Sequence, residues 1–324
     1  TGRDEYVAGV AAEYEALRYR HANRDKTARL QSLGAARDAK HNIDWSQSNP
    51  TRPTFLGAKT FDAYDMNELV GRIDWTPFFR TWELKGTYPS ILKDETIGEA
   101  ARGLFADAET MLKQIVEENW LIAQAVIGFF PANSIGYDDV ELYADDERGE
   151  VAWKLHFLRQ QMLKNSKRGN FSLADFIAPK ETGIEDYIGG FAVTTGIGMR
   201  ERVEAFKAAG DDYNAILLEA LADRLAEAFA ERMHERVRRE FWAYAINEEL
   251  ENQDLIKEKY QGIRPAPGYP ACPDHTEKST LFKLLDVETK TGISLTESFA
   301  MLPAASVSGF YFSHPDSQYF GVGK

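Results

Sequence analysis

The sequence contains one cysteine, Cys272, among its 324 residues. A single cysteine allows neither an internal disulfide nor a cysteine-rich metal site, so a reducing, cytoplasmic setting is the default expectation. No apolar run approaches the roughly 20 residues of a membrane-spanning helix, and the first residues do not form a signal peptide. Basic residues are also scarce, with 38 Lys and Arg against 51 Asp and Glu and a net charge of −13. Such an acidic chain argues against binding to nucleic acid or to an anionic membrane surface.

Motifs of covalent, phosphate and metal chemistry are missing as well. The chain has no Gly-x-Ser-x-Gly elbow, no P-loop and no zinc-ligand spacing, and its six histidines are scattered. The run 195–198, Thr-Gly-Ile-Gly, lacks the third glycine of a dinucleotide fingerprint, which favours a simple strand-to-helix turn. His275 beside Asp274 has two readings, a proton shuttle or a loop-structuring residue, and the second is favoured. The sequence therefore predicts no catalytic residue and no metal site.

The balance of 44% hydrophobic and 27% charged residues is that of an ordinary globular protein. Helical periodicity predicts helices over 3–40, 65–73, 97–119, 211–246 and 279–291. Short apolar or alternating runs predict strands over 121–130, 139–143, 151–158, 172–177, 187–194, 297–301, 306–312 and 319–322. Because antiparallel runs of strands are separated by long helices, without regular βαβ alternation, the pattern indicates an α+β fold with one main domain.

The most informative stretch runs from Arg264 to Lys278 and carries four prolines. Proline fixes φ, removes the backbone donor and pushes the preceding residue towards extended geometry, so this stretch can be neither helix nor central strand. We expect a stiff loop whose carbonyl groups have few local partners. Gly268 would let a ligand approach the backbone, and Arg264 could hold a carboxylate with two parallel hydrogen bonds. Such a loop suits a small zwitterion carrying a purine, but a surface connector fits the spacing equally well.

Two acidic positions have competing interpretations. Asp74 precedes a predicted helix start with Pro77 in its first turn, which is typical of a helix N-cap. Asp223, Glu227 and His234 lie beside the buried stripe of the helix 211–246, and a solvated acidic face explains Asp223 and Glu227 most simply. Like charges one turn apart are mildly unfavourable, however, unless a cation lies near them.

Several segments resemble one known family. The run 262–275, Gly-Ile-Arg-Pro-Ala-Pro-Gly-Tyr-Pro-Ala-Cys-Pro-Asp-His, is similar to the signature of the C-terminal activation domain of cobalamin-dependent methionine synthase. The runs 73–79, 221–231, 300–309 and 311–317 also match this family. The resemblance covers about residues 41 to 324. It implies a bent antiparallel sheet with flanking long helices, and S-adenosylmethionine as a bound methyl donor for the reductive remethylation of cobalamin.

The resemblance also implies roles for individual residues. Arg264 would hold the ligand carboxylate and Asp74 its ammonium group, with Glu227 supporting the ammonium or ordering water. The loop around the sulfonium and adenine contributes Ala266, Tyr269 and Ala271, and the adenosyl-binding aromatic pair aligns with Tyr319 and Phe320. Reduced cobalamin, held on a partner domain outside this chain, supplies the nucleophile, which is consistent with the absence of catalytic motifs.

Three departures from the family pattern bear on this interpretation. Phe320 has no hydroxyl where some relatives carry tyrosine, the chain stops where the family continues into a further helical tail, and the modules for homocysteine, folate and cobalamin are absent. We therefore expect a charged helical linker over residues 1–40 and an S-adenosylmethionine-binding activation domain over 41–324, either excised or free-standing. The implied partners are a cobalamin-binding domain and a flavodoxin-like or other flavoprotein reductant. The alternative is an interaction scaffold that docks these partners without a working ligand site.

Overall fold

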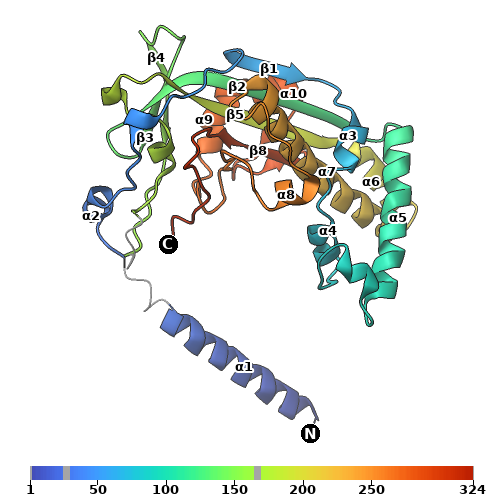
Figure 1. The fold of residues 1–324 in the computed structure, drawn as a ribbon. Helices are drawn as coiled ribbons and strands as arrows, with labels where there is room; N and C mark the ends of the chain where they lie inside the picture. The colour runs from blue at the N-terminus through green and yellow to red at the C-terminus, as the bar shows by residue number, and fades with distance from the viewer. Residues whose placement is uncertain (1, 25–29, 164–168, 324) are drawn as a thin grey trace.

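The computed structural model describes residues 2–24, 30–163 and 169–323. Within them a bent antiparallel sheet of six strands has the order β4-β3-β2-β5-β8, and β1 pairs with β2 (Figure 1). The strands are β1 (Gly57–Phe61), β2 (Ile122–Ile135), β3 (Asp139–Tyr143), β4 (Val151–His156), β5 (Asp186–Ile197) and β8 (Ser306–Tyr311). A second small sheet pairs β6 (Ser294–Leu295) with β7 (Met301–Leu302). The predicted α+β class and the bent antiparallel sheet are confirmed.

Strand β2 continues past Pro131, where the sequence predicted its end at Phe130. One edge of β2 pairs with β1 as far as Phe129 and with β3 from Ala132 onwards, while the other edge pairs with β5 from Ile122 to Ala132. Pro131 lies at the gap between the two partners of the first edge. Because proline lacks a donor, this gap is where a long strand tolerates it.

Helices cover both faces of the sheet. The helices are α1 (Gly2–Arg24), α2 (Leu33–Asp38), α3 (Met66–Val70), α4 (Trp75–Thr81), α5 (Gly98–Glu117), α6 (Met199–Ala208), α7 (Asp212–Arg236), α8 (Asn252–Ile256), α9 (Glu277–Leu285) and α10 (Val287–Thr291). One hydrophobic cluster joins α3, α4, α5 and α7 to one face of the sheet, and a second joins α9, α10 and the segment 171–177 to the other face. Strand β5 is buried on both sides because it lies between these two clusters.

The longest helix, α7, lies across the sheet and ends ten residues before the predicted Ile246. A π-helical turn follows it over Val237–Phe241 and places the buried Arg238 against the ring of Tyr260, with the guanidinium carbon 4.2 Å from the ring centroid. π-helical turns inside or beside an α-helix are frequent at functional sites. This π-helical turn brings the chain at the end of α7 next to the loop that carries Arg264.

Some local predictions are wrong. Residues Leu173–Phe176 form a 3₁₀ turn where a strand was expected, because Asp175 accepts the Ser172 N–H at 2.9 Å and caps the turn. The segment 319–322 forms no ladder of its own, and only Met301 of the predicted 297–301 strand belongs to one. Strand β1 was missed, since its five residues are mostly polar or small. The helix predicted over 279–291 is split at Asp286, whose φ is +54°.

The described residues among the first 40, which are 2–24 and 30–40, form two helices where one was expected. Helix α1 stands apart from the sheet and its covering helices in Figure 1. The residues from Leu30 to Lys40, in contrast, contact the main body through bridges at both ends and through an Arg37–Asp138 ion pair of 2.7 Å. Among the described residues, no helix is both long and apolar enough to cross a bilayer.

Candidate ligand-binding site

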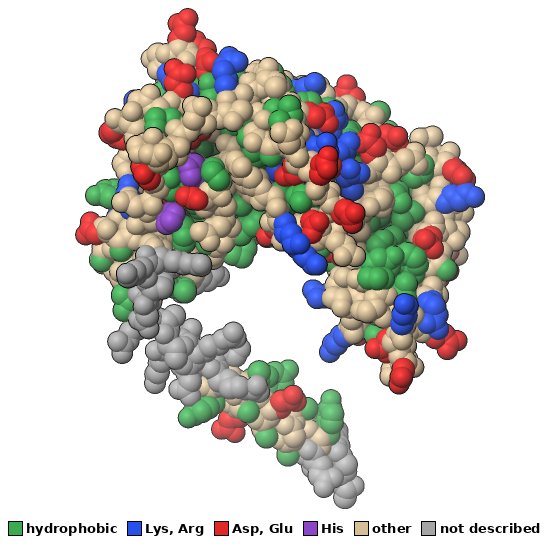
Figure 2. Space-filling model, viewed as in Figure 1, with side chains coloured by type: hydrophobic (Ala, Val, Ile, Leu, Met, Phe, Trp, Pro, Cys, Tyr) green, Lys and Arg blue, Asp and Glu red, His purple; other side chains and the backbone are tan. Residues whose placement is uncertain are grey.

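A cavity of about 220 Å³ opens where α4, α7, α8 and the proline-rich loop meet. Three side chains predicted from the sequence line it together, although they lie far apart in the chain: Asp74, Glu227 and Arg264. The rest of the lining is Arg72, Pro77, Arg224, Ala228, Glu231, Leu255, Ile256 and Glu258. Figure 2 shows acidic and basic side chains side by side over the region of α7. Charges of both signs around one small cavity fit a zwitterion better than a simple ion.

Asp74 is the helix N-cap that the sequence predicted, and it also lines the cavity. Its Oδ1 accepts the N–H of Thr76 at 3.0 Å and so caps the start of α4. The same carboxylate lines the cavity, and its Oδ2 has no hydrogen-bond partner in the described part of the chain. The helix N-terminus therefore fixes the carboxylate while leaving one oxygen available to a ligand ammonium group.

Three side chains contact the guanidinium group of Arg264 and hold it in place. Its Nη2 lies 2.7 Å from Oε2 of Glu231, and its Nη1 donates to the Tyr260 hydroxyl at 2.7 Å and lies 3.3 Å from Nδ1 of His234. Burial alone would lower the pKa of this guanidinium. The negative charge of Glu231 acts in the opposite direction and the pKa is raised, so the guanidinium stays charged. Nε has no acceptor among the described residues, so Nε and the Nη2 donor that Glu231 does not use remain for a carboxylate.

Glu227 lies one helical turn before Glu231 on α7 and is half-buried. The pKa of Tyr269 is raised, first by burial and then by the negative charge of Glu227. Glu227 therefore lies close enough to interact electrostatically with this tyrosine. Tyr269 itself is 59% exposed, so its ring lies at the rim of the site. Asp223, two residues after Leu221 on the same helix, is exposed and does not line the cavity.

The proline-rich loop is more strongly tied to its surroundings than expected. The carbonyl groups of Pro265 and Pro270 accept backbone N–H groups of Phe310 and Val322, at 2.9 and 2.8 Å. Those of Ala266, Tyr269 and Cys272 accept within the loop, so the prediction of few local partners is wrong for these five positions. The carbonyl groups of Pro267, Gly268 and Ala271 receive no hydrogen bond within the described residues, so these positions match the expected pattern.

Gly268 is required by the packing of this loop. Its φ is +101°, and an added Cβ would lie 2.3 Å from the ring of His275. The His275 ring also contacts Lys278, whose Nζ is 3.3 Å from Nδ1. His275 therefore packs against the loop, which favours the loop-structuring role of this histidine over the proton shuttle.

The structure separates the two aromatic residues expected to close the adenosyl pocket. The Tyr319 hydroxyl accepts the backbone N–H of Arg264 at 3.0 Å, so Tyr319 stands next to the cavity. The Phe320 ring instead packs on Phe171, with centroids 5.5 Å apart, and on Phe176. Tyr319 is brought to the site, whereas the ring of Phe320 belongs to the second hydrophobic cluster.

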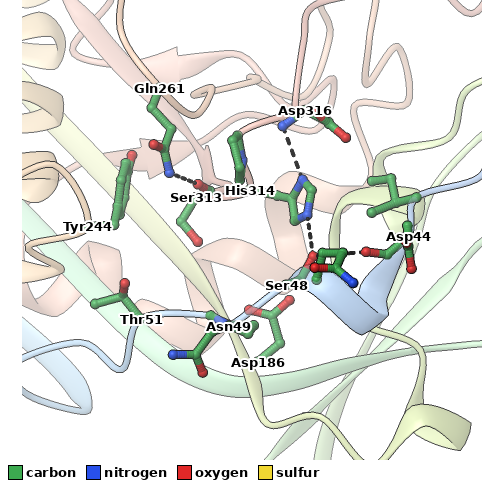
Figure 3. Close-up of a pocket in the computed structure, with 14 residues that line it drawn as sticks. Asp44, Ser48, Asn49, Thr51, Asp186, Tyr244, Gln261, Ser313, His314 and Asp316 are labelled. Carbon is green, nitrogen blue, oxygen red and sulfur yellow. Dashed lines mark hydrogen bonds between the residues drawn. The ribbon is translucent and has the colours of Figure 1, made fainter.

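A larger cavity of about 400 Å³ lies beside Asp186, Tyr244 and His314 (Figure 3). The side chains of Asp186 and His314 are already hydrogen-bonded. Both carboxylate oxygens of Asp186 accept backbone N–H groups, and Nδ1 of His314 accepts the Asp316 N–H at 3.1 Å. The remaining Nε2–H of His314 then donates to Ser48 at 3.1 Å, so this pair cannot act as a base and nucleophile. The smaller cavity is the better candidate.

Comparison with known proteins assigns the family. The family model described as the activation domain of vitamin B12 dependent methionine synthase matches residues 65–324. The chain belongs to this family. The activation domain is also similar to a solved structure described as the crystal structure of the MetH reactivation domain bound to AdoHcy. The two share 54% sequence identity with a TM-score of 0.88, over 90% of this chain and 89% of the other.

Sequence reasoning missed Glu231 and Glu258 in the lining of the cavity of this activation domain, and it placed His234 beside Glu227 without linking it to Arg264. Glu231 lies four residues after Glu227, so the helical repeat already placed it on the same face. Its role was hidden because its partner, Arg264, lies 33 positions further along the chain. Glu258 lies in the short segment after α8, where no periodic pattern marks it.

Proposed function

We propose that this chain binds S-adenosylmethionine in the cavity beside Arg264, as the methyl donor for reductive remethylation of cobalamin in methionine synthase. The observation that carries the proposal is the convergence of Asp74, Glu227 and Arg264 on one cavity from three separate elements. The related reactivation domain has AdoHcy bound, which differs from S-adenosylmethionine by the transferred methyl group and its charge. Membership of the family supports the same conclusion.

The cavity suits the amino acid end of this ligand. Its volume of about 220 Å³ is below the 300–1,000 Å³ typical of pockets for whole cofactors. The carboxylate would bind the Nε–Nη2 edge of Arg264, and the ammonium would lie between Asp74 and Glu227. Pairing both charges matters, because an unpaired buried charge costs several kcal/mol.

The rest of the ligand would extend over the proline-rich loop. The carbonyl groups of Pro267 and Ala271 receive no other hydrogen bond within the described residues, so their negative ends can face the sulfonium or the purine amine. Ala266 and the rings of Tyr269 and Tyr319 would border the adenosyl group. Phe320 would contribute its backbone, since its ring is packed against Phe171. The loop would orient the methyl group and shield it from water.

We assign the binding unit to residues 41–324 and regard 1–40 as an extension towards a neighbouring domain. Cobalamin on that partner domain, reduced by a flavodoxin-like or other flavoprotein donor, supplies the nucleophile for methyl transfer. In this account the isolated chain binds and orients the donor but transfers no methyl group alone. Methyl transfer from labelled S-adenosylmethionine to a small acceptor without cobalamin would overturn that part of the proposal.

Isothermal titration calorimetry tests the binding site directly. We expect S-adenosylmethionine to bind the wild-type chain, and Arg264→Ala to weaken binding by about 2–4 kcal/mol, because the carboxylate loses the guanidinium proposed to hold it. Arg200→Ala is the matched control, since Arg200 is exposed on α6 and pairs only with Glu204 at the surface. Unchanged affinity in Arg264→Ala would refute the assignment.

A further inference from the structure

His234 is a fully buried histidine directly behind Arg264. Its ring stacks on Tyr311, with centroids 5.3 Å apart and planes at 14°, and meets the edge of Tyr260 at 4.9 Å. Its Nδ1 lies 3.3 Å from Nη1 of Arg264, and its Nε2 lies 3.5 Å from the Tyr244 hydroxyl. Both ring nitrogens therefore face polar partners although the ring is inaccessible to solvent.

The contact with Arg264 determines where the proton of this histidine lies. A guanidinium group can only donate, so Nδ1 must accept and cannot carry a proton. In the neutral ring the proton is then on Nε2 and is directed to the Tyr244 oxygen. Tyr244 also lines the larger cavity (Figure 3), so a polar chain runs from that cavity through His234 to Arg264.

The surroundings keep the ring neutral. Burial lowers the pKa of His234 well below its usual value, and the nearby cations Arg238 and Arg264 lower it further. The groups that face the ring from the packed elements are Arg264 and Tyr260 of the segment after α8, Arg238 and Tyr244 at the end of α7, and Tyr311 of β8. A protonated ring would face two guanidinium groups with both nitrogens donating, which this arrangement disfavours.

We propose that His234 is a positioning residue of the ligand site, in which Nδ1 accepts an N–H of Arg264 and fixes the orientation of the guanidinium. Together with Tyr260, His234 takes up both donors of Nη1. Rotation about the last side-chain bonds would break both contacts, so the guanidinium is held in one orientation. A pre-oriented fork spares the ligand carboxylate the cost of ordering a flexible arginine. This inference rests on the proposed binding of S-adenosylmethionine.

Two substitutions separate the acceptor from the packing. His234→Asn places a carbonyl oxygen close to the position of Nδ1, whereas His234→Leu fills a similar volume without an acceptor. Calorimetry with S-adenosylmethionine should show the Asn variant within about threefold of wild type and the Leu variant weakened about tenfold or more, the effect of losing a hydrogen bond to a charged group. Thermal unfolding of both variants reports whether they remain folded.

A measurement on the wild-type chain does not depend on how the variants fold. Nitrogen-15 NMR of histidine-labelled protein should show His234 as the neutral Nε2–H tautomer throughout about pH 5.5–8, the range in which exposed histidines titrate. An Nδ1–H tautomer, titration in that range, or equal affinity losses in the Asn and Leu variants would overturn the inference. Failure of the wild-type chain to bind S-adenosylmethionine would instead refute the proposed function, because the tautomer measurement needs no ligand.

Discussion

Arg264 and Glu231 form an ion pair of 2.7 Å at the wall of the cavity. The second carboxylate oxygen of Glu231, Oε1, is buried without a hydrogen-bond partner and lies 3.9 Å from Nη1 of Arg238, which also lacks one in the described part of the chain. Arg238 is itself clamped by Glu248 at 2.7 Å. The arginine proposed to hold the ligand thus belongs to a buried charge network, whose anion keeps the guanidinium in place but does not occupy all of its donors.

Substitutions of Asp74 should separate its two roles. Asn is as good an N-cap as Asp, so Asp74→Asn should leave thermal stability nearly unchanged, whereas Asp74→Ala should cost about 1 kcal/mol of stability. Both variants lose the negative charge that faces the ligand ammonium, so both should weaken S-adenosylmethionine binding by about 1.5–3 kcal/mol. Calorimetry and thermal unfolding of the same samples provide the check. If affinity in Asp74→Asn equals that of wild type, the carboxylate is only a cap.

The loop should tolerate no side chain at Gly268. Gly268→Ala forces a Cβ into the ring of His275 at a φ of +101° and should destabilise the protein by about 1–3 kcal/mol. It should also weaken ligand binding, because Pro267 and Ala271 move with the loop. Gly103→Ala is the control, since Gly103 lies in α5 with open space around it, and this change should be neutral or slightly stabilising. Equal unfolding temperatures for the two variants would contradict the role given to Gly268.

Asp186 should make stability depend on pH near neutrality. Burial raises the pKa of Asp186 to about 7, opposed by the backbone donors of Ala178 and Tyr187 and then by Arg148. The folded chain therefore keeps this proton to higher pH than the unfolded chain. The stabilisation is complete below about pH 4 and is lost as the pH rises to about 7, a change on the order of 4 kcal/mol.

Urea unfolding between about pH 5 and 8 measures this slope. The variant Asp186→Asn has no titrating group at that position and should show a flatter dependence of unfolding free energy on pH than wild type. Other buried acids contribute in both proteins, so the difference between the two curves isolates Asp186. Parallel curves would show that this carboxyl group does not titrate in the range.

Two truncations test where the binding unit begins. Removal of residues 1–24 should change neither unfolding temperature nor ligand affinity, because α1 stands apart from the main body in Figure 1. Removal of residues 1–40 also deletes the Arg37–Asp138 pair and the buried Ala36, so it should lower the unfolding temperature. Ligand affinity should survive both truncations. Loss of affinity in the shorter truncation would place α1 in the site.

The sequence indicated which charged residues line the cavity, but not how the fold brings them together. Asp74, Glu227 and Arg264 carry the charges that a zwitterion needs, and the family resemblance identified all three. These three residues meet because of how α7 is oriented against the loop after α8, and no local sequence pattern encodes that orientation. The same reason explains why His234 was missed as a partner of Arg264, since its role follows from tertiary packing of the end of α7 against β8.

The errors in the fold prediction also come from tertiary contacts, which the local sequence does not show. A proline in an apolar run suggested a strand end, but the partner strands on one edge of β2 change at that point and the strand continues. Phe320 reads as one of an aromatic pair, yet the rings of neighbouring residues in extended chain point to opposite sides, so only one can face the cavity. Tyr319 is the one beside Arg264.

The most direct test compares two ligands in two proteins. 5′-Methylthioadenosine has the adenosyl group and the sulfur of S-adenosylmethionine but lacks the amino acid end. In the wild-type chain S-adenosylmethionine should bind more tightly by roughly 2–4 kcal/mol, the worth of the charged contacts. In Arg264→Ala most of this difference should disappear. An equal preference for S-adenosylmethionine in both proteins would contradict the account, because it would place the carboxylate elsewhere.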